Sequence, residues 1–199
     1  MTCRQRQIRK AYDLIPNFSD LEERGRLHFF YHSPSSELPV RDVLNEQKED
    51  YKTEPYIEKS AENYCCQCNQ ANIRGFLTSN ERYLFLFTTC RNQRSKHLGK
   101  VCVVGYIEKR RCEFRPGGFY AAIGLLKLFS FGDAYCLGKS ASDNNPRQMQ
   151  KRLNSEKTRK ILKHFRGKVN ILGQCRTQVE RLKKHLPIEV RREQAIRCK

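Results

Sequence analysis

Three apolar segments rich in β-branched and aromatic residues constrain the fold of this chain more than any other feature. They are Tyr83–Thr89 (YLFLFTT), Lys100–Glu108 (KVCVVGYIE) and Phe119–Phe131 (FYAAIGLLKLFSF). Such segments favour short strands separated by turns, and the glycines between and within them supply turn and bend positions. Residues 73–137 therefore predict a small curved sheet or barrel. The apolar runs are nearly continuous, which indicates strands covered on both faces for part of their length.

The flanking regions predict a mixed N-terminal part and a helical C-terminal part. In the first 72 residues we expect a helix over Gln5–Leu14, a strand over Arg26–Tyr31 and a helix over Pro39–Leu44. Near the C-terminus, the stripe Ile161, Leu162 and Phe165 predicts a helix from Ser155 to Phe165 that Gly167 stops. A second helical face predicts a helix over about Asn170–Leu186, which Pro187 ends.

The expected architecture is thus an α+β protein in three parts. Residues 1–72 form an N-terminal extension, residues 73–140 a β-rich core, and residues 141–199 a basic helical tail packed on the core. This division is based on the strand-rich middle of the chain and on the helical periodicity of the residues that follow it.

The charge of the chain lies mainly in the tail. The 199 residues include 39 Lys+Arg and 21 Asp+Glu, a formal net charge of +18, and residues 146–199 alone hold 17 basic and 4 acidic side chains. So dense a positive charge repels itself unless an anionic partner neutralises it. DNA or RNA is the first partner expected, and an acidic protein is the second.

Membrane insertion and export are not expected. The longest apolar runs are far shorter than the roughly 18 residues that a spanning helix needs. The start of the chain, MTCRQRQIRK, lacks the apolar centre of a signal peptide. We therefore expect an intracellular protein, cytoplasmic or nuclear, whose ten cysteines are mainly reduced thiols.

No cofactor is expected from the cysteine spacing. Cys65 and Cys68 form one C-x2-C pair, whereas a structural zinc site needs a second pair or a pair with histidine. Zinc bound through Cys65 and Cys68 stays as an alternative, because strands could bring Cys90 or Cys112 close to them.

The candidate binding site begins where the first apolar segment ends. Polar and cationic residues follow the strand there, and a base could stack and have its edge read at such a strand end. The opposite interpretation is a strand that simply continues into a polar loop. The candidate residues at and around this pocket are Thr88, Thr89, Arg91, Asn92, Tyr106, Phe119 and Tyr120. The candidate phosphate contacts on the tail helices are Lys163, Arg176, Arg181, Lys183 and Lys184.

The stretches YLFLFTTCRN, KVCVVGYIEKRRCEF and FYAAIGLLKLFSFGDAY resemble, in their order, the core of the PUA-like superfamily, which includes EVE, YTH and ASCH domains. The resemblance covers about residues 73–137. It implies a small pseudobarrel that binds RNA or modified bases in DNA, in some members by flipping a base into an aromatic cage. Cages of the YTH group use tryptophan, which this chain lacks, so a cage here would consist of Tyr and Phe.

The function expected from these features is nucleic-acid binding without catalysis. One alternative is a metal-dependent nuclease or nucleic-acid-modifying enzyme, built on Glu108 with Lys109 or on the set Asp42, Glu46 and Lys48. The other alternative is an adaptor that binds an acidic protein through its basic helices. The sequence contains neither a phosphate-binding loop ending in Lys-Ser/Thr nor an H-E-x-x-H motif.

Overall fold

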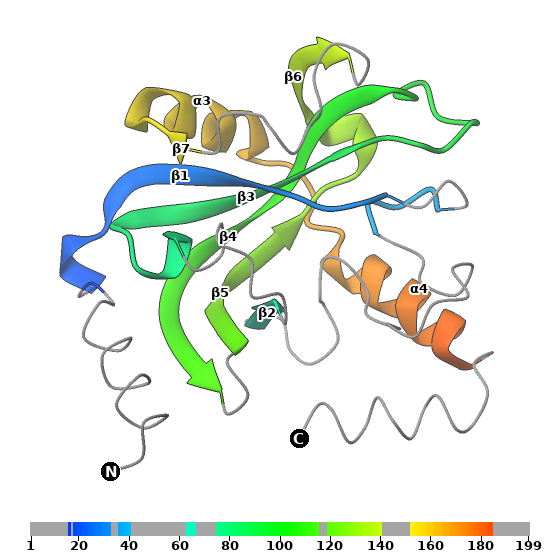
Figure 1. Ribbon diagram of the computed structural model, residues 1–199. Coiled ribbons are helices and arrows are strands. Elements are labelled where there is room, and N and C mark those ends of the chain that lie inside the picture. The colour runs from blue at the N-terminus through cyan, green and yellow to red at the C-terminus, as the bar shows by residue number, and fades with distance from the viewer. Residues whose placement is uncertain are drawn as a thin grey trace.

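The protein is a mixed α+β structure, and in the part of the chain that the structure describes one sheet is covered by helices on its two faces (Figure 1). The computed structural model describes residues 16, 18–32, 36–40, 63–66, 75–115, 119–140 and 152–184. The helix expected over Gln5–Leu14, and most of the one expected over Pro39–Leu44, lie outside these residues. The strands are β1 (Glu22–Phe29), β2 (Asn63–Cys66), β3 (Glu81–Thr89), β4 (Lys100–Arg115), β5 (Phe119–Leu128), β6 (Tyr135–Ser140) and β7 (Arg152–Leu153). The helical elements are η1 (Phe18–Asp20), η3 (Phe131–Asp133), α3 (Ser155–Phe165) and α4 (Leu172–Lys184).

The seven strands form one sheet in the order β2-β5-β4-β3-β1-β7, with β6 paired to β4 off this path. Strands β3, β4 and β5 form an antiparallel meander, and they correspond to the three apolar segments of the sequence. Strand β1 pairs with β3 in parallel, with Leu27 opposite Phe85. Because β1 and β2 come from the first 72 residues and β7 from the tail, all three predicted parts of the chain contribute to the sheet.

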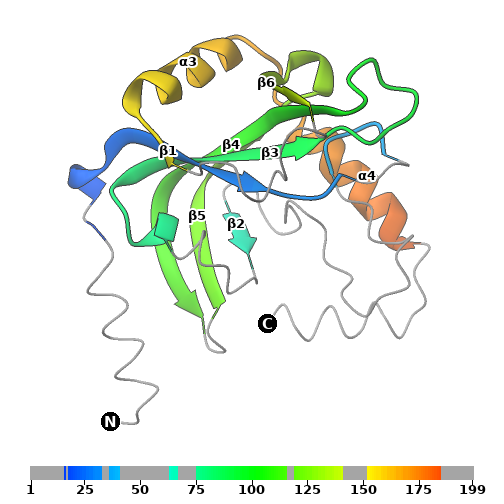
Figure 2. The same cartoon turned by 45° about the horizontal axis from the view of Figure 1, so that its top comes forward.

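Both faces of the sheet are buried, as the continuous apolar runs predict. Along β3, Leu84 and Leu86 belong to one core cluster, while Phe85 and Phe87 belong to the other. Helix α3 packs on the second cluster through Ile161 and Phe165, so we call this side the α3 face. The first cluster includes Ile171, Leu172 and Cys175 at the start of α4, and we call this side the α4 face. The two helices lie on opposite sides of the sheet (Figure 2).

A bulge in β4 decides which of its side chains lie on the α3 face. Leu86 pairs with Gly105 but the next residue, Phe87, pairs with Val103, so β4 holds one extra residue between these pairs. Successive side chains alternate between faces, and one inserted residue exchanges the faces for everything beyond it. Before the bulge, the odd-numbered residue Val103 lies on the α3 face. After the bulge, the even-numbered residue Tyr106 lies on that face, and Ile107 lies on the other.

Helix α3 begins and ends at the residues that the sequence pattern indicates. The Asn154 side chain caps it by accepting a hydrogen bond from the backbone nitrogen of Lys157 at 2.9 Å. Its buried residues are Thr158, Ile161 and Phe165. Gly167, with φ of 77°, follows the last turn in the left-handed conformation that stops a helix. No helix in the described part of the chain is long and apolar enough to cross a membrane.

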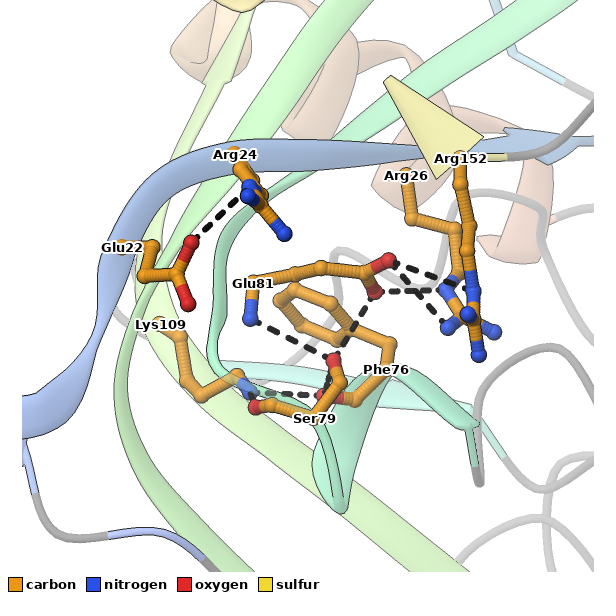
Figure 3. A network of polar contacts seen from close by, with 8 residues as sticks. All are labelled: Glu22, Arg24, Arg26, Phe76, Ser79, Glu81, Lys109 and Arg152. Atoms are coloured by element: carbon orange, nitrogen blue, oxygen red, sulfur yellow. Dashed lines mark hydrogen bonds and ion pairs between the residues drawn. The ribbon is translucent and has the colours of Figure 1, made fainter. Parts of the chain in front are cut away.

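A buried polar network on the α4 face joins β1, β3 and β4 (Figure 3). Arg26 Nε donates to Glu81 Oε2 at 2.6 Å, and Arg26 Nη2 donates to Glu81 Oε1 at 3.3 Å. Ser79 Oγ donates to Glu81 Oε2 at 2.8 Å. Lys109 Nζ donates to the carbonyl oxygens of Phe76 at 2.6 Å and Ser79 at 2.7 Å. These partners replace the water that the buried charges lose, and they tie β1 to the start of β3.

Gly124 in β5 lies so close to β4 that a side chain has no room there. A Cβ atom at Gly124 would collide with the carbonyl oxygen of Glu108, which belongs to the backbone and cannot rotate away. We expect Gly124→Ala to lower the free energy of unfolding by about 2 kcal/mol, because overpacking displaces a strand. Urea denaturation measures this loss.

Gly173 in α4 is the matched control for Gly124. Nothing lies within 4 Å of a Cβ atom added at Gly173. Gly173→Ala should raise the free energy of unfolding by about 0.5 kcal/mol, because alanine has the higher helix propensity. Equal losses for the two variants would contradict the close approach of β5 to β4.

Candidate functional site

A pocket of about 660 Å³ opens between the α3 face of the sheet and helix α3. This volume is in the range of pockets that hold small molecules and single nucleotides. The pocket residues from the sheet and its strands are Glu23, Tyr83, Tyr106, Glu108, Lys127 and Phe129. Those from α3 and the segment after it are Arg159, Leu162, Lys163, Phe165, Arg166, Gly167, Lys168 and Asn170.

Aromatic rings form one wall of the pocket. Phe129 and Phe165 are stacked, with ring centroids 4.2 Å apart and an interplanar angle of 9°, and both are buried. Tyr106 stacks beside Phe129 at 6.1 Å, and Tyr83 meets Tyr106 edge-on at 6.0 Å. Tyr83 and Tyr106 are only half-buried. Their rings, held in place by the buried pair behind them, are the aromatic surface that a ligand can contact.

Cationic side chains form the rim of the pocket. Two of the five are engaged with carboxylates: Arg159 lies 3.9 Å from Glu23, and Lys168 lies 3.1 Å from Asp133. Within the described residues, Lys127, Lys163 and Arg166 have no carboxylate partner. Lys127 Nζ instead lies 5.8 Å from the centroid of the Tyr106 ring. Three cations beside partly exposed aromatic rings create a positive potential that attracts an anionic, aromatic ligand.

The segment after α3 is anchored at several points, which fixes this part of the rim. Asn170 Oδ1 accepts hydrogen bonds from the backbone nitrogens of Leu128 and Leu172, each at 3.1 Å. Lys168 donates to the Asp133 carboxylate, and this hydrogen bond is the main reason that the pKa of Asp133 is below its usual value. His164 Nε2 lies 2.9 Å from the Asp133 carbonyl oxygen. These contacts hold the end of α3 and the segment after it against β5 and η3.

Two carboxylates, Glu23 and Glu108, also line the pocket. Glu108 is half-buried and lies opposite Tyr83 in the pairing of β4 with β3. Burial, and then the charge of Glu108, raise the pKa of Tyr83 above its usual value. The Tyr83 phenol therefore stays protonated at neutral pH and can donate a hydrogen bond.

Of the residues predicted from the sequence, Tyr106 and Lys163 line this pocket. The strand-end residues lie at the other end of β3 and do not line it. Thr88 is fully buried and donates from Oγ1 to the Phe30 carbonyl at 2.7 Å. Asn92 is buried too, with Nδ2 donating to the Ser36 carbonyl at 3.0 Å and Oδ1 accepting from the Arg94 nitrogen at 2.8 Å. These two side chains hold the turn after β3 in place.

The other predicted contacts are spread over the molecule. Thr89 is half-buried and Arg91 is exposed, beside that same turn. In α4, which packs on the opposite face, Arg176 is half-buried and Arg181 is exposed. For Phe119 and Tyr120 in β5, and for Lys183 and Lys184 in α4, the side chains lie outside the described residues. The structure therefore does not gather the twelve predicted residues into one site.

Sequence reasoning missed Tyr83, Lys127 and Arg166, which contribute an aromatic ring and two of the three free cations. One signal for Lys127 was present, since it is the single charged residue in the otherwise apolar run FYAAIGLLKLFSF. A charge within a strand covered on both faces needs either polar partners or an opening to solvent on its face. Nothing local to Tyr83 or Arg166 distinguishes them from core and surface residues.

Of the sets considered for a nuclease, the pair Glu108 and Lys109 is separated by the sheet. Glu108 lies on the α3 face, whereas Lys109 is buried on the α4 face, over the Phe76 ring. Asp42, Glu46 and Lys48 lie outside the described residues, as does Cys68 of the C-x2-C pair. Among the described residues, no three His, Cys, Asp or Glu side chains are grouped to hold a metal ion.

The cysteines with described side chains are free thiols: Cys90, Cys102 and Cys175 are buried, and Cys136 is exposed. Burial raises the pKa of Cys175 to about 12 and also raises that of Cys102. At neutral pH these two thiols stay protonated, and they pack as small apolar side chains.

No protein-family model, curated protein or solved structure matches this chain. The functional assignment therefore depends on the residues and geometry of the pocket.

Proposed function

We propose that the protein binds single-stranded nucleic acid, with an unpaired base in the pocket under α3 and the neighbouring phosphates on its rim. The observation that carries this proposal is the combination of two partly exposed tyrosine rings with three cations that have no carboxylate partner among the described residues. Aromatic rings that stack bases, together with cations that follow the backbone, are the two components of single-strand binding. In a duplex the base faces are stacked on one another and are not accessible.

The tyrosines and the cations of the pocket would have different roles. Tyr83 and Tyr106 would stack the base, which contributes about 1–3 kcal/mol per base in such sites. Lys127, Lys163 and Arg166 would contact phosphates, which position the strand without reading its sequence. The basic residues of α4 and the chain beyond it add long-range attraction for a polyanion.

A PUA-like core is the finer fold assignment that we propose with this function. The meander β3–β4–β5 has the strand order that the resemblance implies, and the pocket sits beside it. Binding to an acidic protein is the second candidate, because the net charge of +18 favours it equally. The partly exposed tyrosine rings favour nucleic acid, since each nucleotide offers a flat base for stacking whereas the Asp and Glu side chains of an acidic protein do not.

Fluorescence anisotropy with matched single-stranded and double-stranded DNA and RNA, each over a series of salt concentrations, tests the proposal. We expect the single-stranded probes to bind more tightly than the duplexes, with affinity that falls as salt rises. Some affinity should persist at high salt, because stacking does not depend on counterion release. Tighter duplex binding, or no binding to any of the four probes at low salt, would contradict the proposal.

A further inference from the structure

We propose that Glu108 makes this pocket selective for guanine. This inference rests on the proposed single-strand binding, and it concerns which base the pocket accepts. Glu108 lies two residues after Tyr106 on β4 and opposite Tyr83 on β3, so its carboxylate lies beside both partly exposed rings on the α3 face. A base stacked there has its edge within reach of that carboxylate.

A carboxylate in this position weakens the binding of a polyanion unless the ligand supplies donors to it. Lys127, Lys163 and Arg166 attract a negatively charged ligand to the pocket, and the negative charge of Glu108 weakens this attraction. Within the described residues, Glu108 forms no ion pair. Glu23 is different, since it lies 3.9 Å from Arg159, which takes up its charge. Glu108 is thus the pocket carboxylate left to accept hydrogen bonds from a ligand.

Guanine is the base whose edge best fits two carboxylate oxygens. Its N1–H and N2–H₂ groups are adjacent donors, so both oxygens can accept hydrogen bonds at once, and such charge-assisted pairs are strong. Adenine and cytosine each offer one amino group beside a ring nitrogen that accepts, and this nitrogen would repel the second oxygen. Uracil and thymine offer a single N–H between two carbonyl oxygens. Reading a base along this edge requires that it be unpaired, as the proposed function supposes.

Single-base substitution in an oligouridine probe tests this inference on the unmodified protein. The central position carries guanosine, inosine, 2-aminopurine riboside or adenosine in otherwise identical 11-mers, and affinity is measured by anisotropy. Inosine keeps N1–H but lacks the N2 amino group, and 2-aminopurine keeps the amino group but lacks N1–H. We expect guanosine to bind about tenfold more tightly than inosine or 2-aminopurine, and adenosine to bind most weakly, because each lost charge-assisted hydrogen bond costs about that factor.

The variants Glu108→Gln and Glu23→Gln form a matched pair, because each removes one carboxylate from the same pocket. Glu23→Gln should raise the affinity for every probe slightly, by removing repulsion. Glu108→Gln should raise it slightly for the adenosine probe but lower it for the guanosine probe, which loses a charge-assisted hydrogen bond. Only Glu108→Gln should reduce the preference for guanosine over adenosine, by about tenfold, because one accepting oxygen becomes a donating amide. Circular dichroism confirms that each variant is folded.

Three results would overturn the inference in distinguishable ways. Equal affinity of the unmodified protein for guanosine and adenosine probes would refute guanine selectivity and leave single-strand binding standing. A guanosine preference that survives Glu108→Gln would refute the role of Glu108. If that preference is lost in Glu23→Gln, Glu23 is the carboxylate that recognises guanine. Failure of all probes to bind would refute both this inference and the proposed function.

Discussion

Replacing the three free pocket cations together, as Lys127→Gln, Lys163→Gln and Arg166→Gln, should weaken single-strand binding about 100-fold at low salt. Each contact between a cation and a phosphate at a partly exposed site is worth about 1 kcal/mol, and three such contacts give about two decades in affinity. The dependence of log K on log salt should also become shallower by about 2, because three fewer counterions are displaced from a single strand. Anisotropy titrations at several salt concentrations measure both quantities.

The control for this variant removes the same charge elsewhere on the two helices. Lys157 and Lys160 on α3 and Arg181 on α4 are exposed and do not line the pocket. Replacing them with glutamine should weaken binding by less than about threefold, because only long-range attraction is lost. If both triple variants weaken binding equally, the nucleic acid is held by a diffuse basic surface and the pocket has no special role.

Replacing Arg26 with methionine should lower the free energy of unfolding by about 3–5 kcal/mol, which is a large part of the stability of an ordinary domain. The side chains of Arg26 and Glu81 are only 7% and 9% exposed, and they face each other across β1 and β3. Without Arg26, the Glu81 carboxylate stays buried with the Ser79 hydroxyl and, at 3.8 Å, the exposed Arg152. Urea denaturation measures the loss as a shift in the transition midpoint.

The double variant Arg26→Met, Glu81→Leu tests whether the loss comes from an uncompensated charge. Removing both partners should recover much of the stability, because apolar side chains of similar size replace the pair. Arg24→Met is the matched control on the same strand. Arg24 pairs with Glu22 at 2.8 Å, but both side chains are about half exposed (56% and 46%), so its loss should cost less than about 1 kcal/mol. Similar losses for Arg24→Met and Arg26→Met would contradict the buried character of the network.

Local pattern predicted the strands β3, β4 and β5 and the helix α3 closely. Their signals are short-range: β-branched and aromatic runs favour strands, and the cap, apolar stripe and final Gly167 define a helix. Continuous apolar runs also indicated that the sheet would be covered on both faces. These features depend on residues that are near one another in the chain, so they can be recognised from the sequence alone.

The pocket could be predicted only in part, because its residues come together through long-range pairing. Tyr106 and Lys163 were candidates on chemical grounds, as an aromatic residue in a strand and a cation on a helix. Tyr83 and Arg166 line the same pocket because helix α3 packs over this face of the sheet, and no local sequence pattern predicts this packing. The strand-end cluster at Thr88 and Asn92 had suitable chemistry, but the chain uses those side chains to hold Phe30 and Ser36 in place.

The bulge in β4 shows which features of the protein follow from the sequence alone and which depend on the tertiary structure. The sequence by itself determined an apolar, two-sided sheet, a helix at Ser155–Phe165 and a basic C-terminal part, because these follow from propensity, periodicity and charge. Regular alternation along β4 from Val101 would place Tyr106 and Glu108 on the α4 face. One extra residue between the pairs Leu86–Gly105 and Phe87–Val103 brings both to the α3 face instead. Pairing with the neighbouring strands decides the register of β4, so only the tertiary structure could place an aromatic ring and a carboxylate under α3.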